Sequence, residues 1–397
     1  MGRGDFGVNF SQCTIICQVI ACYTHLQLRH KAAETIQARL AEKETPRLWC
    51  LLGDATDDLD CYYKALELSK DKSARAYRSI GFHYYVHKDY ATCVQYFEKS
   101  LERSSFQPIT VLRLAYAAME LENWELGAKS YRSYCAMEQD SFEAWNNLAR
   151  CYVNLKQKER AWKVLQEAVR CDFENWKIWD NMMVIAVDIG VFDDTIRAYN
   201  RIMDLKKTHV DKAVLGILVK AVNGDVEDCS GQGSSKLRPE LQKLLARITV
   251  GSPREPAPWH LYGDLLSASG KEEVLAFSSY FLSLDSISYQ EVRAAQCYQK
   301  SVAAVTGHRG WEKVPDSCKE VLACSNDWLN LLGRVEGAEV LQLLNSARLS
   351  VANVVKAVEK AQAKVETGKL SEEMEGLVAP VREALNLLMD RVTQLKS

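Results

Sequence analysis

Proline is scarce in this sequence. Only eight of the 397 residues are prolines, and three of these lie between positions 251 and 258. Because proline breaks the interior of a helix, the long proline-free stretches permit helices almost anywhere. Opposite charges nearly balance, with a formal net charge of −2, so no strong field draws the chain to nucleic acid or to an anionic membrane. No stretch approaches the roughly 20 apolar residues of a membrane span. We therefore predict neither direct nucleic-acid binding nor a membrane partner.

Recognisable catalytic and cofactor motifs are also missing. The sequence contains no phosphate-binding loop, dinucleotide fingerprint, Gly-x-Ser-x-Gly elbow or His-Glu-x-x-His motif. His83 and His87 are four residues apart and could share one face of a helix, but no carboxylate or thiol at ligand spacing completes a metal site. We predict no catalytic residues, no metal ligands and no cofactor, and hence a protein that is not an enzyme.

The thirteen cysteines include no Cys-x-x-Cys pair. Cys93, Cys151 and Cys297 fall among apolar residues at helical spacing, which is typical of buried thiols. A chain of this length does not need disulfides, so we expect a reducing compartment, the cytoplasm, with the nucleus as an additional location. The apolar run Thr14 to Ala21 loosely resembles a secretory signal, but the charged helical pattern that follows to Glu44 argues against one.

An internal repeat is the strongest pattern in the sequence. Seven columns of residues recur at a constant interval of 34 positions over four units. The first column holds Tyr77, Val111, Trp145 and Trp179. A column of mostly small residues holds Gly81, Ala115, Ala149 and Met183. A column in the second half of each unit holds Phe97, Tyr131, Leu165 and Tyr199. The first four columns are spaced as one face of a helix and the last three as the face of a second, with a polar turn between them. Each unit is therefore a predicted hairpin of a helix A and a helix B.

These columns resemble the tetratricopeptide repeat family. The best-matching unit carries Trp145, Leu148, Ala149, Tyr152, Ala161, Leu165 and Ala168. A shortened unit precedes the four, with Trp49, Leu52, Gly53, Tyr62 and Ala65, and another follows at Trp259, Tyr262, Gly263 and Leu266. The proline that the family places near the end of each unit is replaced by Ser105, Gln139, Phe173 and Lys207. The resemblance implies an all-α superhelix, or solenoid.

The resemblance also implies function. Members of the family are regarded as non-enzymatic, and those that the stretch from about Leu40 onward resembles most are linked to chaperone-assisted assembly. That stretch matches the C-terminal half of a longer family member, which implies an N-terminally truncated or alternative form. We therefore expect a scaffold or adaptor for protein complexes. The alternative is an RNA-processing factor with half-tetratricopeptide-like repeats that acts through protein partners, because Trp145, Trp176 and Trp179 would suit that family too.

We expect five parts along the chain. Residues 1–46 form an N-terminal helical segment, and 47–207 hold the shortened unit and the four 34-residue units. Residues 208–258 supply a helix and a flexible Gly/Ser/Pro linker, in which 251–258 cannot be helical because of the prolines. Residues 259–306 contain degenerate repeats. Residues 307–397 form a C-terminal helical region that ends in a hairpin of long helices.

The last helices leave two interpretations open. A long helix from Glu336 to Glu366 ends near Gly368, a predicted C-cap, and Ser371 begins the next one. That helix carries a seam with coiled-coil spacing: Met374, Val378, Val381, Leu385, Leu388, Val392 and Leu395. The seam either caps the last repeat within the chain or receives a coiled-coil partner.

Stacked helices A line the concave groove of such a solenoid, where partners bind. The groove candidates by periodicity are Arg78, Phe82, Arg113, Tyr116, Asn147, Arg150, Lys177 and Asn181. Of the aromatic run Phe82, Tyr84, Tyr85, Tyr90, Tyr96 and Phe97, most are predicted to be core, with Phe82 facing the groove. Neither repeat frame supplies the paired donors of the family's two-carboxylate clamp, since Phe82 or Leu112 stands where a donor is needed. We expect a protein or peptide in the groove, bound in another way.

Overall fold

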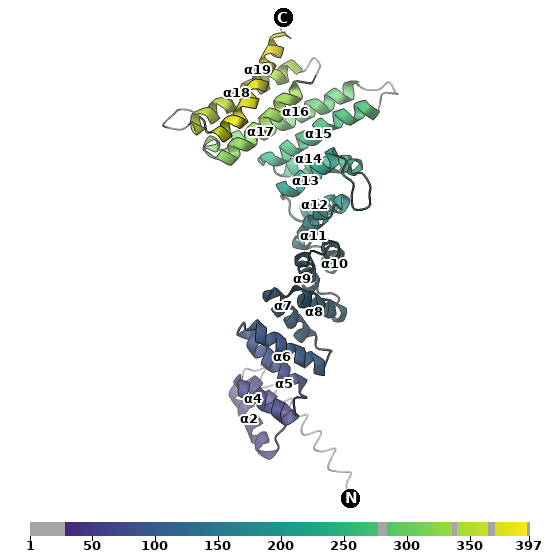
Figure 1. The fold of residues 1–397 in the computed structure, drawn as a ribbon, viewed down its shortest axis with the longest axis vertical. Helices are drawn as coiled ribbons and strands as arrows, with labels where there is room; N and C mark the ends of the chain where they lie inside the picture. The colour runs from purple at the N-terminus through teal and green to yellow at the C-terminus, as the bar shows by residue number, and fades with distance from the viewer. Residues whose placement is uncertain (1–27, 277–283, 336–339, 364–369, 395–397) are drawn as a thin grey trace. The chain divides into compact units, whose positions relative to one another are not determined.

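The computed structural model describes residues 28–276, 284–335, 340–363 and 370–394 (Figure 1). Within these ranges the chain forms eighteen α-helices, and backbone pairing is limited to an isolated bridge between Glu227 and Gly233. The predicted all-α class is therefore confirmed. The chain divides into two compact units, Met1–Phe173 and Glu174–Ser397, which are described separately. The apolar run Thr14 to Ala21 lies outside the described residues.

The first unit consists of consecutive helical hairpins. Its helices are α2 (Arg29–Glu42), α3 (Pro46–Thr56), α4 (Leu59–Ser69), α5 (Ala74–Val86), α6 (Tyr90–Arg103), α7 (Pro108–Glu120), α8 (Trp124–Met137), α9 (Phe142–Asn154) and α10 (Lys158–Cys171). Helix α3 pairs with α4, α5 with α6, α7 with α8 and α9 with α10, each pair lying side by side (Figure 1). The 34-residue register is retained: helices A begin at Ala74, Pro108 and Phe142.

The turns between helices A and B repeat as well. Lys88, Glu122 and Lys156 all adopt the left-handed conformation, with φ of 62°, 56° and 61°. After two of these turns a side chain caps helix B: Asp89 accepts from the Thr92 amide and Asn123 from the Leu126 amide. Such caps satisfy backbone donors that the first turn of a helix leaves without an acceptor. The polar residues of the turns therefore start helix B at the same repeat position.

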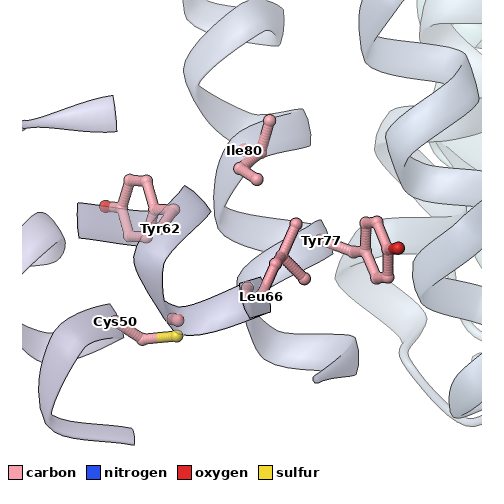
Figure 2. Packing of buried hydrophobic residues seen from close by; sticks show 7 residues of the cluster. Cys50, Tyr62, Leu66, Tyr77 and Ile80 are labelled. Atoms are coloured by element: carbon pink, nitrogen blue, oxygen red, sulfur yellow. The ribbon is translucent and has the colours of Figure 1, made fainter. Parts of the chain in front are cut away.

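The repeat columns form the core of these hairpins. Tyr77 and Ile80 of α5 are buried together with Cys50, Tyr62 and Leu66 of the preceding hairpin (Figure 2). The small column marks the closest approach of the two helices, as predicted. A Cβ atom at Gly53 would lie 2.6 Å from the Tyr62 ring. Only glycine permits that separation.

The aromatic run is less buried than predicted. Phe97 is fully buried, but Phe82, Tyr84, Tyr85, Tyr90 and Tyr96 are only half-buried. All five pack against the buried clusters of these hairpins, so the prediction that most of the run belongs to the core is confirmed only in part. The reason is physical: helix periodicity places tyrosine rings toward the neighbouring hairpin, and their hydroxyls stay near water. The Tyr63 hydroxyl, for example, lies 3.4 Å from that of Tyr84 and 3.2 Å from that of Tyr96.

The second unit begins with a further repeat hairpin and ends with longer helices. Its elements are α11 (Trp176–Asp188), α12 (Phe192–Leu205), α13 (Lys212–Asn223), η1 (Ser234–Leu237), α14 (Arg238–Gly251), α15 (Pro256–Ala276), α16 (Leu284–Thr306), η2 (Trp311–Lys313), α17 (Pro315–Leu332), α18 (Val340–Gln362) and α19 (Glu372–Gln394). Helices α15 and α16 pair around Gly263, whose added Cβ would lie 2.7 Å from the Tyr298 ring. The same glycine–aromatic contact thus recurs in the hairpin predicted at Trp259.

The proline-rich segment corrects one prediction. Residues 251–258 were expected to be non-helical, yet Pro256 is the first residue of α15 and Pro258 lies in its first turn. Proline is tolerated there because the amide groups of the first turn have no intrahelical acceptor. The Gly/Ser-rich loop between α13 and η1 is held by its aspartates, since Asp225 accepts from the Ser235 amide at 2.9 Å and Asp228 accepts from the Gln232 amide at 2.9 Å.

The C-terminal hairpin buries its own seam. Every seam residue from Met374 to Val392 is buried, and α19 packs on α17 and α18. Arg391 donates to the carbonyls of Leu332 and Val335 at 2.7 and 2.6 Å, which ties α19 to the end of α17. The contacts therefore favour the capping interpretation and give no support to a coiled-coil partner there. The seam residue Leu395 and the predicted C-cap Gly368 lie outside the described residues.

Candidate functional site

The predicted groove residues occupy four successive helices A. Arg78 and Phe82 lie on α5, Arg113 and Tyr116 on α7, and Asn147 and Arg150 on α9, all in the first unit; Lys177 and Asn181 lie on α11, in the second. Helices α5 and α7 are in contact with each other. Tyr116, Arg150, Lys177 and Asn181 are exposed, and the other four are half-buried.

Arg113 is held by aromatic rings rather than by hydrogen bonds. Its guanidinium carbon lies 4.9 Å from the centre of the Phe82 ring and 5.0 Å from that of Tyr85. Phe82 in turn packs edge-on against the buried Phe97, with ring centres 5.2 Å apart. Within the described residues the structure gives the Arg113 side chain no hydrogen bond or ion pair. A stacked guanidinium keeps its N–H edge available for a ligand.

Three tyrosines extend this surface. The ring centres of Tyr85, Tyr90 and Tyr116 are 5.9, 6.1 and 6.3 Å apart in pairs, each pair edge to face. The cluster joins α5, α6 and α7, and Tyr116 is 38% exposed. A hydrogen bond to Glu120 raises the pKa of the Tyr116 hydroxyl, and partial burial raises it further, so the phenol stays protonated. The result is an exposed ring held in place by two others.

Sequence reasoning missed Tyr85 and Tyr90 as parts of this surface. Both belong to the aromatic run that was predicted to be mostly core, and helix periodicity places neither of them among the residues that line the groove. Their positions in the repeat were the available signal: Tyr85 directly follows the column residue Tyr84, and Tyr90 is the first residue of helix B.

Asn147 and Arg78 form hydrogen bonds to neighbouring side chains of the chain. Asn147 donates to the Tyr131 hydroxyl at 3.3 Å. Arg78 donates to the side-chain carbonyl of Gln107 at 3.2 Å, and Gln107 also bonds to the buried Ser100. These contacts orient the helices, so Arg78 and Asn147 are weaker candidates for ligand contact than Arg113, Tyr116 and Arg150.

The first unit also contains a pocket outside this surface. It has a volume of about 470 Å³ and lies among α8, α9 and α10; its lining residues include Arg132, Cys135, Trp145, Arg170 and Cys171. None of the eight predicted residues lines it. Burial raises the pKa of Cys135 to about 12, and it raises that of Cys171 as well, so neither thiol is activated as a nucleophile.

One group of side chains has metal-ligand geometry, and sequence reasoning missed it. Within the described residues, the donor atoms of His260, Asp264 and Asp327 lie within 4.8 Å of one another. His260 and Asp264 are one helical turn apart on α15, which was a visible signal. Asp327 comes from α17, and no sequence spacing indicated that it joins them. The His83 and His87 rings have their centres 4.3 Å apart and their planes tilted by 35°.

Comparisons with known proteins agree with the repeat pattern. No protein-family model matches the sequence. The tetratricopeptide repeat-containing protein trd-1 of Caenorhabditis elegans is 30% identical over 388 residues, which are 93% of this chain and 48% of that protein. A Dictyostelium discoideum homologue of tetratricopeptide repeat protein 27 is 26% identical over 62% of this chain and 29% of its own length. This chain thus spans about half the length of these curated relatives, or less.

Solved structures of the same kind are also similar. The crystal structure titled YrrB, a TPR protein with an unusual peptide-binding site, is 20% identical and covers 45% of this chain and 95% of its own, with a TM-score of 0.40. None of the described helices is both long and apolar enough to cross a membrane. The repeat columns, the hairpins that they form and the curated relatives agree: this chain is built of tetratricopeptide-type repeats and is similar to proteins named for that repeat.

Proposed function

We propose that this chain is a non-enzymatic scaffold that binds a protein or peptide partner on the helix A face of its first unit. The observation that carries the proposal is the Arg113 guanidinium, which lies over the Phe82 and Tyr85 rings without a hydrogen bond or ion pair in the described part of the chain; the exposed Tyr116 ring follows three residues later on the same helix. Arginine and tyrosine contribute a large share of the energy in protein interfaces. Because neighbouring rings already hold both side chains in place, binding costs little free energy for ordering them.

Charge favours a partner that offers carboxylate or carbonyl oxygens. Arg113 and Arg150 are cationic, and within the described residues neither side chain has a hydrogen bond or ion pair. A guanidinium edge pairs best with such acceptors, in particular with both oxygens of a carboxylate. We place this activity in the assembly of protein complexes, linked to chaperones, in the cytoplasm or the nucleus. The resemblance to chaperone-linked family members supports the link to chaperones and to complex assembly.

The test compares two double variants of the full chain. Tyr116→Ala with Arg150→Ala removes the exposed aromatic and the unpaired cation of the helix A face. The control, Phe106→Ala with Arg160→Ala, removes an exposed aromatic and an exposed arginine that lie outside helices A. We expect the first variant to lose its partners in affinity purification with quantitative mass spectrometry, while its helicity and melting temperature stay native. Retention of the full set of partners by the first variant, or equal loss by the control, would refute the assignment.

A further inference from the structure

Three side chains from two helices converge in the second unit. His260 and Asp264 project from the same face of α15, and Asp327 comes from α17. The Nε2 atom of His260 lies 2.9 Å from Oδ2 of Asp327 and 3.8 Å from Oδ1 of Asp264. Ligand atoms bound at about 2.1 Å to one ion are roughly 3 to 4 Å apart. Both separations from Nε2 fall within that range, and the three ligand atoms lie within 4.8 Å of one another.

The ligand atoms are oriented by a buried neighbour. Tyr298 of α16, whose side chain is 2% exposed, donates its hydroxyl proton to Oδ1 of Asp264 at 2.7 Å. Its ring also packs edge-on against His260, with ring centres 5.7 Å apart. A second layer of hydrogen bonds that fixes the ligands is characteristic of protein metal sites. A carboxylate oxygen has two lone pairs, so Asp264 can accept from Tyr298 and still coordinate an ion.

The charges of the cluster call for a cation. Within the described residues, the ion pairs of Asp264 and Asp327 are both with His260, so two carboxylates face one imidazole. Glu320 also lies near, although Lys212 pairs with it at 2.6 Å. No Lys or Arg in the described part of the chain pairs with either aspartate, so a divalent cation would offset the charge of the two carboxylates.

We propose that His260, Asp264 and Asp327 bind a divalent transition-metal ion, Zn²⁺ in particular. An imidazole nitrogen with two carboxylate oxygens is a donor set that suits zinc, whereas magnesium and calcium prefer oxygen ligands alone. The ion takes the place of the hydrogen on Nε2: a protonated imidazolium releases that proton to solvent, whereas a neutral imidazole carries its hydrogen on Nδ1 instead. Three protein ligands leave a position for water. The ion crosslinks α15 to α17, so its role is to stabilise this part of the second unit, independently of partner binding in the first.

The test uses the full chain after chelator treatment and dialysis. We expect isothermal titration calorimetry with zinc chloride to show one site that Asp327→Asn weakens at least about tenfold. The control is Asp316→Asn, an exposed aspartate at the start of the same helix, which should bind as the unaltered chain does. Zinc should also raise the melting temperature of the unaltered chain and of Asp316→Asn, but not of Asp327→Asn. Magnesium chloride should produce neither effect.

A cobalt titration separates this site from the cysteines. Co²⁺ in the proposed site should give visible d–d bands without a thiolate charge-transfer band, and His260→Gln should remove those bands. This arm decides the question if Asp327→Asn proves unstable before metal is added. Absence of zinc binding, equal affinity in Asp327→Asn and Asp316→Asn, or a thiolate band for the bound cobalt would each overturn the proposal. In those cases the hydrogen bond between His260 and Asp327 serves only to join α15 to α17.

Discussion

Gly81 and Phe97 define the spacing within the first full repeat hairpin, because a Cβ atom at Gly81 would lie 2.5 Å from Cδ1 of the Phe97 ring. Phe97 is fully buried and cannot move aside without opening the core of α5 and α6. The small column of the repeat is therefore a steric requirement.

The first prediction tests that requirement. Gly81→Ala should lower the stability of the chain, because overpacking costs about 1–3 kcal/mol and exceeds the gain in helix propensity of about 1 kcal/mol. The matched control is Gly216→Ala in α13, where an added Cβ has no atom within 4 Å. That change should stabilise by about 0.5–1 kcal/mol. Urea denaturation followed by circular dichroism measures both, and equal shifts of the two midpoints would contradict the steric argument.

A second prediction concerns the cysteines. Burial raises the pKa of Cys93 to about 12 and that of Cys297 to about 11, and both side chains are shielded from solvent. Cys229 is exposed in the loop after α13. Because the thiolate is the reactive form, iodoacetamide at neutral pH should label Cys229 rapidly and the two buried thiols slowly. Peptide-level mass spectrometry gives the rates, with urea-unfolded chain as the reference, in which all three should react alike.

The third prediction is a pH dependence. His209 lies between α12 and α13 with its ring centre 5.3 Å from that of Tyr199. Burial lowers the pKa of His209 below its ordinary value of 6.5, and Asp180, with Oδ1 at 3.5 Å from Nε2, offsets this only in part. The unfolded chain therefore binds this proton more readily than the folded chain. The neutral imidazole contributes its full stability above pH 6.5, and that contribution is lost as the pH falls from 6.5 toward the folded pKa.

His209→Gln provides the measurement. Its melting temperature is compared with that of the unaltered chain at several pH values between about 8 and 5. The difference in favour of the unaltered chain should shrink as the pH falls below 6.5. Subtraction removes the other titrating groups, among them His260, which both proteins share. A difference that stays constant, or grows, at low pH would show that the His209 pKa is not lowered.

The repeat hairpins were predictable because one interval fixes both helices and the turn between them. The 34-residue spacing carries column residues, caps and the left-handed turn position together, so α5 to α10 begin and end in register. Periodicity also placed Arg113 and Tyr116 on one face. It could not show that Phe82 and Tyr85 flank the Arg113 guanidinium, because that contact depends on side-chain rotamers across two hairpins.

Contacts between distant segments were beyond reach for a different reason. His260 and Asp264 share a helix face, but Asp327 follows only after an entire intervening helix, and one sequence contains no signal for that pairing. The prediction drawn from the prolines of residues 251–258 was wrong because the effect of a proline depends on its position in the helix. Pro256 is the first residue of α15, where proline is tolerated; a proline in the interior of the helix would have broken it.

The final prediction concerns two neighbouring leucines of α19. Leu388 lies in the seam and is 4% exposed, whereas Leu387 is 66% exposed. If the seam is filled by α17 and α18 of the same chain, Leu388→Ala leaves a cavity and should cost about 2–5 kcal/mol. Leu387→Ala should change stability by no more than about 0.5 kcal/mol. Urea denaturation of the purified chain, together with limited proteolysis of the tail, tests both. A seam that waited for a partner chain would be solvated in the isolated protein, so Leu388→Ala would then be as harmless as Leu387→Ala. That result would return the last helix to the status of a binding surface.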